Sequence, residues 1–217
     1  MATIVVVRTH AQVEDDTEIE TIDMDEVTDA EAEAEAAAAE TRRLLKARRN
    51  PSDLFAGIRL ESEDSVLLPM INVTSCTLRD GAQLLPLHQA LADKRSEAVI
   101  LRMVEVYPDS LKVKGPHGEL PLHLALEFGA SEAVIEQMIH LYREALTEED
   151  DDGHLPLHTL FTSGAAGAST AVIARLIKEH PEALKGETKR GWTPDQLAEE
   201  AGQEAAVVQL RAAKEEL

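Results

Sequence analysis

The fold of this chain is decided by the stretch PLHQALADKRSEAVILRMVEVYPDSLKVKGPHGEL, residues 86–120. It is followed in register by PLHLALEFGASEAVIEQMIHLYREALTEEDDDGHL, residues 121–155, which shares fifteen of 35 positions with it. A third copy begins at Pro156 and returns to register after three extra residues near 164–168. An incomplete fourth copy opens at Gly191 with GWTPDQLAEEAG. A period of this length is typical of proteins built from stacked copies of one small unit.

Local signals inside each copy predict two short helices and a turn. Each of the three Pro-Leu-His triplets places proline at the first helical position, where its missing N–H costs nothing. A serine then precedes the second helix as its N-cap; these serines are Ser96, Ser131 and Ser169. Pro108 and Pro181 are expected to end that second helix in two copies, because the residue before a proline disfavours helical geometry.

The copies resemble the ankyrin repeat, whose period is about 33 and whose signature is Gly-x-Thr-Pro-Leu-His. The residues that carry the resemblance are GELPLH (118–123), GHLPLH (153–158) and GWTP (191–194). Leucine replaces the threonine in the first three copies, and Gln196 replaces the histidine in the last. The resemblance covers about residues 81–217. It implies an all-α fold, a helix-turn-helix solenoid with short β-turn fingers.

The repeat domain is therefore expected over 86–217, in units 86–120, 121–155, 156–193 and 194–217. Residues 51–85 have two interpretations. Pro51 stands 35 residues before Pro86, which favours a degenerate repeat. Pro69 falls where the second helix of such a repeat would run, which favours an irregular N-terminal cap. Solenoids need caps because an end repeat otherwise leaves an apolar face in water.

Residues 1–50 form a charged N-terminal arm by composition. Residues 14–40 carry thirteen carboxylates and no lysine or arginine. So much like charge does not support a core, so 14–28 are expected to be extended. Residues 29–49 predict a helix, because alanine and glutamate lead into a basic end that suits the helix dipole. Residues 3–8 (TIVVVR) could form a strand, paired with another chain or loose.

The charge limits the partners. The 217 residues carry a formal net charge of −20 at pH 7, which argues against direct binding to nucleic acid or to an anionic membrane. A protein partner with a basic surface is favoured instead. The single cysteine, Cys76, excludes an internal disulfide framework. No apolar run reaches the roughly 18 residues of a transmembrane helix, and the N-terminus does not match a secretory signal. We expect an intracellular protein, cytoplasmic or nuclear, with an organelle possible and the oligomeric state open.

Three histidines recur with the repeat: His88, His123 and His158. Residues one repeat apart would lie roughly 10 Å from one another in neighbouring layers. That is too far to share one metal ion with bonds of about 2 Å. The three are expected to be structural and to hydrogen-bond the backbone of the fingers.

Two local patterns resemble a metal site and a phosphate-binding loop, but each has a simpler structural interpretation. Asp151, Asp152, His154 and His158 could hold a metal, but Pro156 starts a helix between the two histidines and separates them. A solvated acidic fingertip is the preferred interpretation. GAAGAST, residues 164–170, lacks the lysine of a phosphate loop and follows no strand, so it is taken as an insertion. We expect no metal, no cofactor and no catalytic residues, hence no enzyme.

Candidate partner-binding residues are those that vary between copies. The position before the Leu/Thr-Pro step holds Glu119, His154 and Trp192, and the family resemblance implies that it faces a concave groove. Phe128, near the end of a first helix, is expected to be exposed there too. Aromatic side chains often anchor interfaces. The alternative is that Trp192 packs on the end cap and Phe128 on a neighbouring helix.

The acidic run is the other candidate surface. The copy 121–155 has nine carboxylates and one arginine, and its loop carries Asp150, Asp151 and Asp152. Either this charge only aids solubility, or it binds a basic partner. The sequence thus predicts a non-catalytic protein–protein interaction module: an ankyrin-repeat scaffold or adaptor, or an accessory subunit of a larger assembly. The alternative is an acidic regulator or chaperone that shields a basic protein or mimics nucleic acid.

Overall fold

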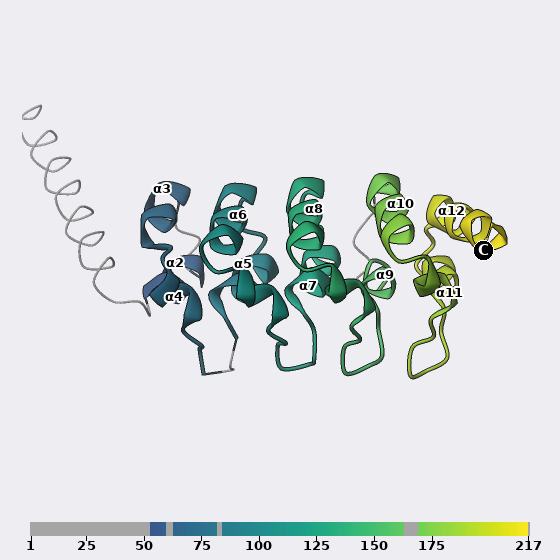
Figure 1. The fold of residues 1–217 in the computed structure, drawn as a ribbon, viewed down its shortest axis with the longest axis horizontal. Helices are drawn as coiled ribbons and strands as arrows, with labels where there is room; N and C mark the ends of the chain where they lie inside the picture. The colour runs from purple at the N-terminus through teal and green to yellow at the C-terminus, as the bar shows by residue number, and fades with distance from the viewer. Residues whose placement is uncertain (1–52, 60–62, 82–83, 163–168, 217) are drawn as a thin grey trace, which may run out of the picture. The chain divides into compact units, whose positions relative to one another are not determined.

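The computed structural model describes residues 53–59, 63–81, 84–162 and 169–216 (Figure 1). All of them belong to the second of two compact units into which the chain divides, Arg43–Leu217. The arm expected over 1–50, with its helix at 29–49 and its strand at 3–8, lies outside the described residues, as does the insertion at 164–168.

Every regular element in the described residues is helical, and none of these residues lies in a strand, which confirms the predicted all-α class. Four helix pairs follow the repeat register. They are α5 (Pro86–Ala92) with α6 (Glu97–Val106), α7 (Pro121–Glu127) with α8 (Glu132–Leu141), α9 (Pro156–Thr159) with α10 (Thr170–Glu179), and α11 (Pro194–Glu200) with α12 (Glu204–Glu215). A 3-10 turn follows each of the first three pairs: η2 (Pro108–Lys112), η3 (Arg143–Thr147) and η4 (Pro181–Lys185).

The pairs stand side by side in a row, and the loops that join them project on the same side (Figure 1). First helices pack against first helices, α5 on α7, α7 on α9 and α9 on α11. Second helices do the same where α6 packs on α8 and α10 on α12. Each pair therefore buries its apolar face against the next pair, so the order of the copies along the chain is also their order in space.

The segment before the first copy takes the place of a helix pair. It holds α2 (Asp53–Arg59), α3 (Asp64–Leu67), η1 (Leu68–Met70) and α4 (Val73–Thr77). Here α2 packs against α5 and α3 packs against α6, as the corresponding helices of later copies do. The α-helix stops at Leu67, and Pro69 lies inside the 3-10 turn that follows. The segment thus makes the contacts of a repeat with shorter, irregular helices.

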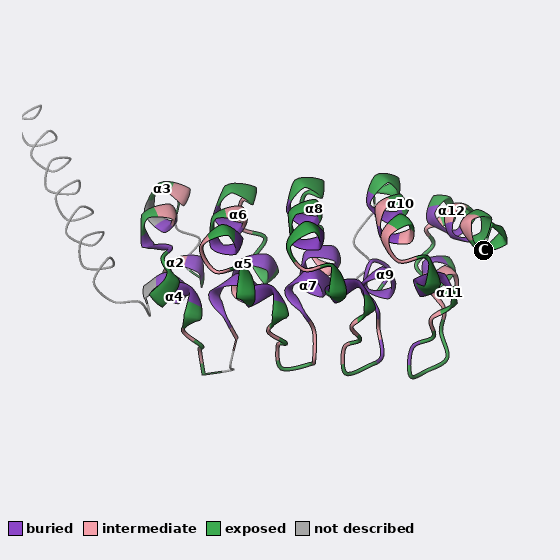
Figure 2. Cartoon of the chain, viewed as in Figure 1, coloured by how far each residue is buried: buried purple, intermediate pink, exposed green. Residues whose placement is uncertain are grey.

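The core runs through the row as one cluster of aliphatic side chains. The first helices α5, α7 and α9 are buried on most sides, whereas α11 and the second helices are exposed on their outer sides (Figure 2). The second helices bury Val-Ile and the residues one turn later: Val99, Ile100, Met103 and Val104; Val134, Ile135, Met138 and Ile139; Val172, Ile173 and Leu176. Each such side chain contributes about 1.5–3 kcal/mol when fully buried, so the repeated apolar positions stabilise the stack.

Caps and turns follow the local sequence. The side chains of Ser96 and Ser131 accept hydrogen bonds from the backbone N–H groups of Val99 and Val134, whereas Ser169 caps α10 without such a bond. The residue that reverses the chain after the first helix has a left-handed backbone: φ is 51° at Lys94, 73° at Gly129 and 69° at Gly202. Glycine adopts this geometry freely and lysine does not.

The first helix of the third copy, α9, is shorter than the other first helices. The helices α5, α7 and α11 have seven residues each, whereas α9 has four. At its end the hydroxyl of Thr159 donates to the carbonyl oxygen of Pro156 at 2.9 Å, and Thr162 donates to that of Thr159 at 3.1 Å. The chain leaves the helix there, just before the extra residues of this copy.

Three connecting loops, here called finger 1 (113–120), finger 2 (148–155) and finger 3 (186–193), share one backbone design. In finger 2 the N–H of Asp150 donates to the carbonyl oxygen of His154 at 3.1 Å, and the turn closes at Gly153 with φ of 79°. Fingers 1 and 3 repeat both features. Neighbouring fingers are also joined, because Asp151 N–H donates to the carbonyl oxygen of His117 at 2.9 Å and Lys189 N–H to that of Asp152 at 3.0 Å.

Candidate partner-binding surface

The three repeated histidines each join a first helix to the finger that follows. The ring of His123 is buried, and its Nδ1 accepts a hydrogen bond from the N–H of Leu120 at 3.1 Å. Its Nε2 lies 3.1 Å from the carbonyl oxygen of His154 in finger 2. An N–H donor on one nitrogen and an acceptor at the other assign the neutral ring with its proton on Nε2.

His158 repeats both contacts toward finger 3, whereas His88 repeats only the contact toward finger 1, since its Nδ1 has no hydrogen-bond partner among the described residues. His158 Nε2 lies 3.2 Å from the carbonyl oxygen of Gly186, and His88 Nε2 lies 3.0 Å from that of Val113. Burial lowers the pKa of all three histidines, and it lowers the pKa of His158 to about 4. The neutral rings therefore fix the positions of the fingers.

The last copy keeps the hydrogen bond at the start of its first helix but has no histidine to contact a finger. Gln196 stands where the other copies have histidine, and its Oε1 accepts from the N–H of Thr193 at 3.0 Å. No second hydrogen bond of the Gln196 side chain is found among the residues that the structure describes. An amide oxygen thus replaces the imidazole nitrogen as the acceptor at this helix start.

Asp150 was a candidate partner contact, and the structure directs its carboxylate into its own finger. Its Oδ1 accepts from the N–H groups of Asp152 at 2.9 Å and His154 at 2.8 Å. Its Oδ2 lies 3.0 Å from Nδ1 of His154. Burial raises the pKa of Asp150, but these hydrogen bonds and the His154 ring outweigh it and hold the pKa below the ordinary value. The carboxylate organises the turn.

Residues at the register position of Asp150 also accept hydrogen bonds in two other turns. Asp80 Oδ1 accepts from Leu84 N–H at 3.0 Å, and Thr188 Oγ1 accepts from Trp192 N–H at 3.2 Å. Finger 1 has Gly115 there, and Glu119 turns back toward it: its carboxylate accepts from the N–H of His117 at 2.8 Å. The spacing of 35 between Asp80, Gly115 and Asp150 could have revealed this shared position in the sequence.

The predicted variable residues therefore differ in what they offer a partner. The side chains of Glu119 and His154 are engaged inside their own fingers. The indole of Trp192, 38 % exposed, makes no hydrogen bond to the residues that the structure describes. Asp151 and Asp152 are exposed at the tip of finger 2.

Lysines of the neighbouring fingers bracket this acidic tip. Lys114 pairs with Glu148 at 2.9 Å and donates to the carbonyl oxygen of Glu149 at 3.0 Å. From the other side, the ammonium group of Lys189 donates to the carbonyl oxygen of Asp151. Part of the negative charge of finger 2 is thus balanced by the chain itself.

Phe128 lies apart from these residues. It is partly buried at the end of α7 and lines a small depression of about 120 Å³ with Lys94, Arg95 and Ile100. This depression lies between the connections that follow α5 and α7, and it shares no residue with the surroundings of Trp192. Phe128 and Trp192 therefore line separate depressions, and whether both contact one partner stays a prediction.

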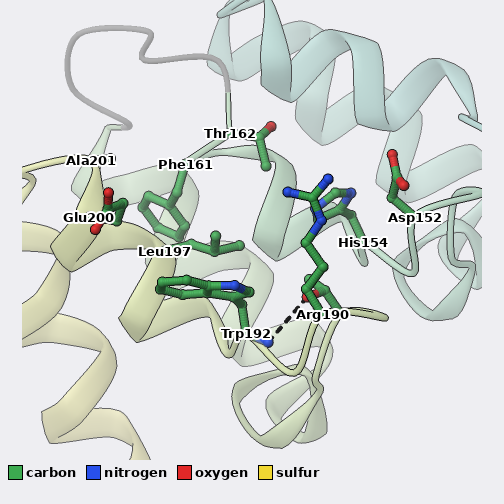
Figure 3. A pocket seen from close by; sticks show the side chains of 10 residues that line it. Asp152, His154, Phe161, Thr162, Arg190, Trp192, Leu197, Glu200 and Ala201 are labelled. Carbon is green, nitrogen blue, oxygen red and sulfur yellow. Dashed lines mark hydrogen bonds between the residues drawn. The ribbon is translucent and has the colours of Figure 1, made fainter.

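Trp192 instead lines a pocket of about 530 Å³ between fingers 2 and 3 (Figure 3). Apolar walls come from Phe161, Leu197 and Ala201, and charged groups come from Asp152, Arg190 and Glu200. In Figure 3 the indole lies beneath Leu197 and Phe161, with Glu200 toward one end and Arg190, His154 and Asp152 toward the other.

The short helix α9 accounts for the position of this pocket. The chain leaves the helix after Thr159, and Phe161 and Thr162 of the following turn form its wall. Phe161, which was not predicted as a site residue, is 4 % exposed. It stands at the register position of Leu91 and Leu126, both buried, so the repeat alignment could have placed it in the core.

Metal binding, a reactive thiol and a membrane-spanning helix were each checked in the described residues. No group of three or more His, Cys, Asp or Glu is placed to hold a metal ion in this part of the chain. Cys76 is buried, and burial raises the pKa of its thiol to about 11, so it is protonated at neutral pH. No helix of the described ranges is long and apolar enough to cross a membrane.

A scan against protein-family models gives no match for this chain, and a search of curated proteins finds none with significant sequence similarity.

Proposed function

We propose that this chain is a non-catalytic protein–protein interaction module, an ankyrin-like repeat protein that acts as an adaptor or as an accessory subunit of a larger assembly. The observation that carries the proposal is the surface made by fingers 2 and 3. Its backbone is fixed by shared hydrogen bonds, and the side chain at its variable position, Trp192, is left half-exposed.

Ankyrin-like character is supported by three features of the repeat. The Pro-Leu-His motif starts the first helix, and its histidine binds the next finger. A glycine with positive φ closes each finger turn: Gly118, Gly153 and Gly191. These features are repeated at the same register in successive copies, so one local design generates the whole row.

A rigid surface suits recognition without catalysis. Binding costs free energy for every loop that must be ordered, and preorganised loops avoid much of that cost. Here three sets of hydrogen bonds hold the fingers: those of the repeated histidines, those of Asp150 in finger 2 and Thr188 in finger 3, and backbone hydrogen bonds between neighbouring fingers.

Charge favours a partner with a basic surface. The copy 121–155 has nine carboxylates and one arginine, and the whole chain has a formal charge of −20. Opposite charge raises association rates and disfavours acidic competitors. We place this interaction inside the cell, in the cytoplasm or nucleus, in keeping with the single cysteine of the sequence.

A second candidate function rests on the arm. Residues 14–40 carry thirteen carboxylates and no basic residue, a composition suited to shielding a basic protein or occupying a nucleic-acid site. Binding through such a segment depends strongly on salt, because exposed charges are screened within about 8 Å at physiological ionic strength.

Crosslinking mass spectrometry in native extract tests the proposal. Lys114 and Lys189 report on the fingers, and Lys46 reports on the arm. The interaction module predicts crosslinks from the finger lysines to one recurring protein, retained at high salt. Crosslinks from Lys46 alone that vanish at high salt would favour the acidic regulator, and their absence from all three lysines would contradict both functions.

A further inference from the structure

We infer that the pocket beside Trp192 receives an arginine or lysine side chain of the partner protein. This inference rests on the proposed function and adds to it the chemistry of one contact. The bound side chain lays its aliphatic part on the indole and on Leu197, and its cationic head lies at Glu200.

The indole supplies the surface for a cation. Trp192 is the only tryptophan of the chain, and its ring is exposed to the pocket between fingers 2 and 3. A second depression of about 330 Å³ also borders the ring and shares Arg190 and Glu200 with the first. Tryptophan attracts cations over its ring face more strongly than other aromatic residues do.

The apolar wall accounts for the stem of the side chain. Phe161, Leu197 and Ala201 line the same pocket as the indole (Figure 3). Arginine and lysine bury three or four methylene groups while the charged head stays near water. A pocket that is apolar in the middle and charged at its ends matches this shape better than it matches a wholly apolar side chain.

Glu200 supplies the anion. Its carboxylate is exposed at the end of α11 and makes no ion pair or hydrogen bond with the residues described in the structure. The adjacent Glu199 differs, because Arg211 holds its carboxylate at 2.6 Å. A cation arriving at the pocket therefore finds Glu200 available and Glu199 already paired.

Arg190 occupies the opposite end, beside His154 and Asp152 (Figure 3). Its positive charge opposes a second cation in the pocket. The pocket lining still favours a cation, because it contains two carboxylates, Asp152 and Glu200, against the one arginine. Removing the charge of Arg190 should then strengthen the binding of a basic side chain, whereas an acidic occupant would require Arg190.

Selection from a displayed library of random 12-residue peptides tests the inference on the full chain. Peptides are selected on the wild-type chain and then screened for loss of binding to Trp192→Ala. We expect those lost to share an arginine or lysine. In synthetic copies, replacing that arginine by citrulline, or that lysine by norleucine, should weaken binding about tenfold.

Variants of the chain then locate the contact. Glu200→Gln should weaken the selected peptides about fivefold to tenfold, while Glu199→Gln, which removes the same charge one residue away, should change binding less than about twofold. Arg190→Gln should leave binding unchanged or tighten it. The fluorescence of Trp192 reads out binding in all three variants, and circular dichroism melting verifies that each is folded.

Each other outcome is informative. Peptides that need Trp192 but lack a basic residue, or that carry an essential acid and fail on Arg190→Gln, would overturn the inference. So would a library that yields no binder. Peptides that bind the chain equally well after Trp192→Ala would also overturn it, but they would leave the proposed interaction module standing. If analytical sedimentation showed that the wild type is a dimer and that Trp192→Ala is a monomer, the pocket would instead be occupied by a second copy of the chain, and the inference would be overturned.

Discussion

His123 holds finger 2 through the backbone of His154: its Nε2 lies 3.1 Å from the His154 carbonyl oxygen, while its Nδ1 accepts the N–H of Leu120. One buried neutral ring thus ties the start of α7 to the loop that begins the next copy. Because His88 and His158 repeat the contact, the histidines set the positions of all three fingers.

Two replacements of His123 should measure separately what its two hydrogen bonds contribute to the free energy of unfolding. His123→Ala removes both and leaves a cavity, so it should lower the free energy of unfolding by about 3 kcal/mol. His123→Gln retains an acceptor for Leu120, as Gln196 does for Thr193, and should cost about 1 kcal/mol. Urea denaturation measures both values. Equal losses for the two variants would contradict the assigned role of Nδ1.

The lowered histidine pKa values predict a pH dependence of stability. A histidine with a pKa near 6.5 when unfolded and about 4 when folded, as at His158, binds more protons in the unfolded state between these values. The stabilisation is therefore complete above about pH 6.5 and is lost as the pH falls toward 4. Thermal melting from pH 7 to pH 4.5 should show a falling transition temperature.

His158→Gln provides the control for that experiment, because glutamine does not titrate. The variant should be less stable at pH 7, and its melting temperature should fall less than that of the wild type on acidification. A parallel fall in both proteins would show that carboxylates, not His158, set the pH dependence.

Asp150 should matter for stability and its neighbour should not. Asp150→Ala leaves the N–H groups of Asp152 and His154 without their acceptor and should cost about 1–2 kcal/mol. Asp151→Ala removes an equal charge from an exposed side chain and should stay within about 0.5 kcal/mol of the wild type. Hydrogen exchange of the His154 amide provides a local reading, with faster exchange expected only in Asp150→Ala.

The left-handed position after the first helix predicts a pair of opposite effects. Lys94→Gly should stabilise the chain by up to about 1 kcal/mol, because lysine at φ of 51° is strained. Gly129→Ala should destabilise it by about 1 kcal/mol, since no atom crowds the added carbon and only the backbone strain remains. Thermal denaturation checks both, and a destabilised Lys94→Gly would show that the lysine side chain makes contacts worth more than the strain.

The repeat register made much of the fold predictable from sequence. Proline starts, serine caps and Val-Ile pairs recur at intervals of 35 or 38 residues, and each is a local signal that tertiary packing then reinforces. The segment before Pro86 lacks these signals, so its packing of α2 on α5 was left between two interpretations.

The binding surface was less predictable, because it depends on where side chains turn. The acidic run shows that finger 2 is charged, but not that Asp150 points inward. Phe128 and Phe161 differ by two register positions, and only the folded chain shows that the second lies beside Trp192. The early end of α9, whose following turn supplies Phe161 and Thr162 to the pocket, departs from the repeat pattern of the other first helices.

The most direct test of the account measures the affinity of the partner identified by crosslinking for three proteins: the wild type, Trp192→Ala, and the chain without residues 1–40. The finger surface predicts that Trp192→Ala weakens binding at least about tenfold, as expected of an aromatic anchor. It also predicts that the truncated chain retains most of its affinity at high salt. Unchanged affinity for Trp192→Ala, together with loss of binding in the truncated chain, would contradict the central claim.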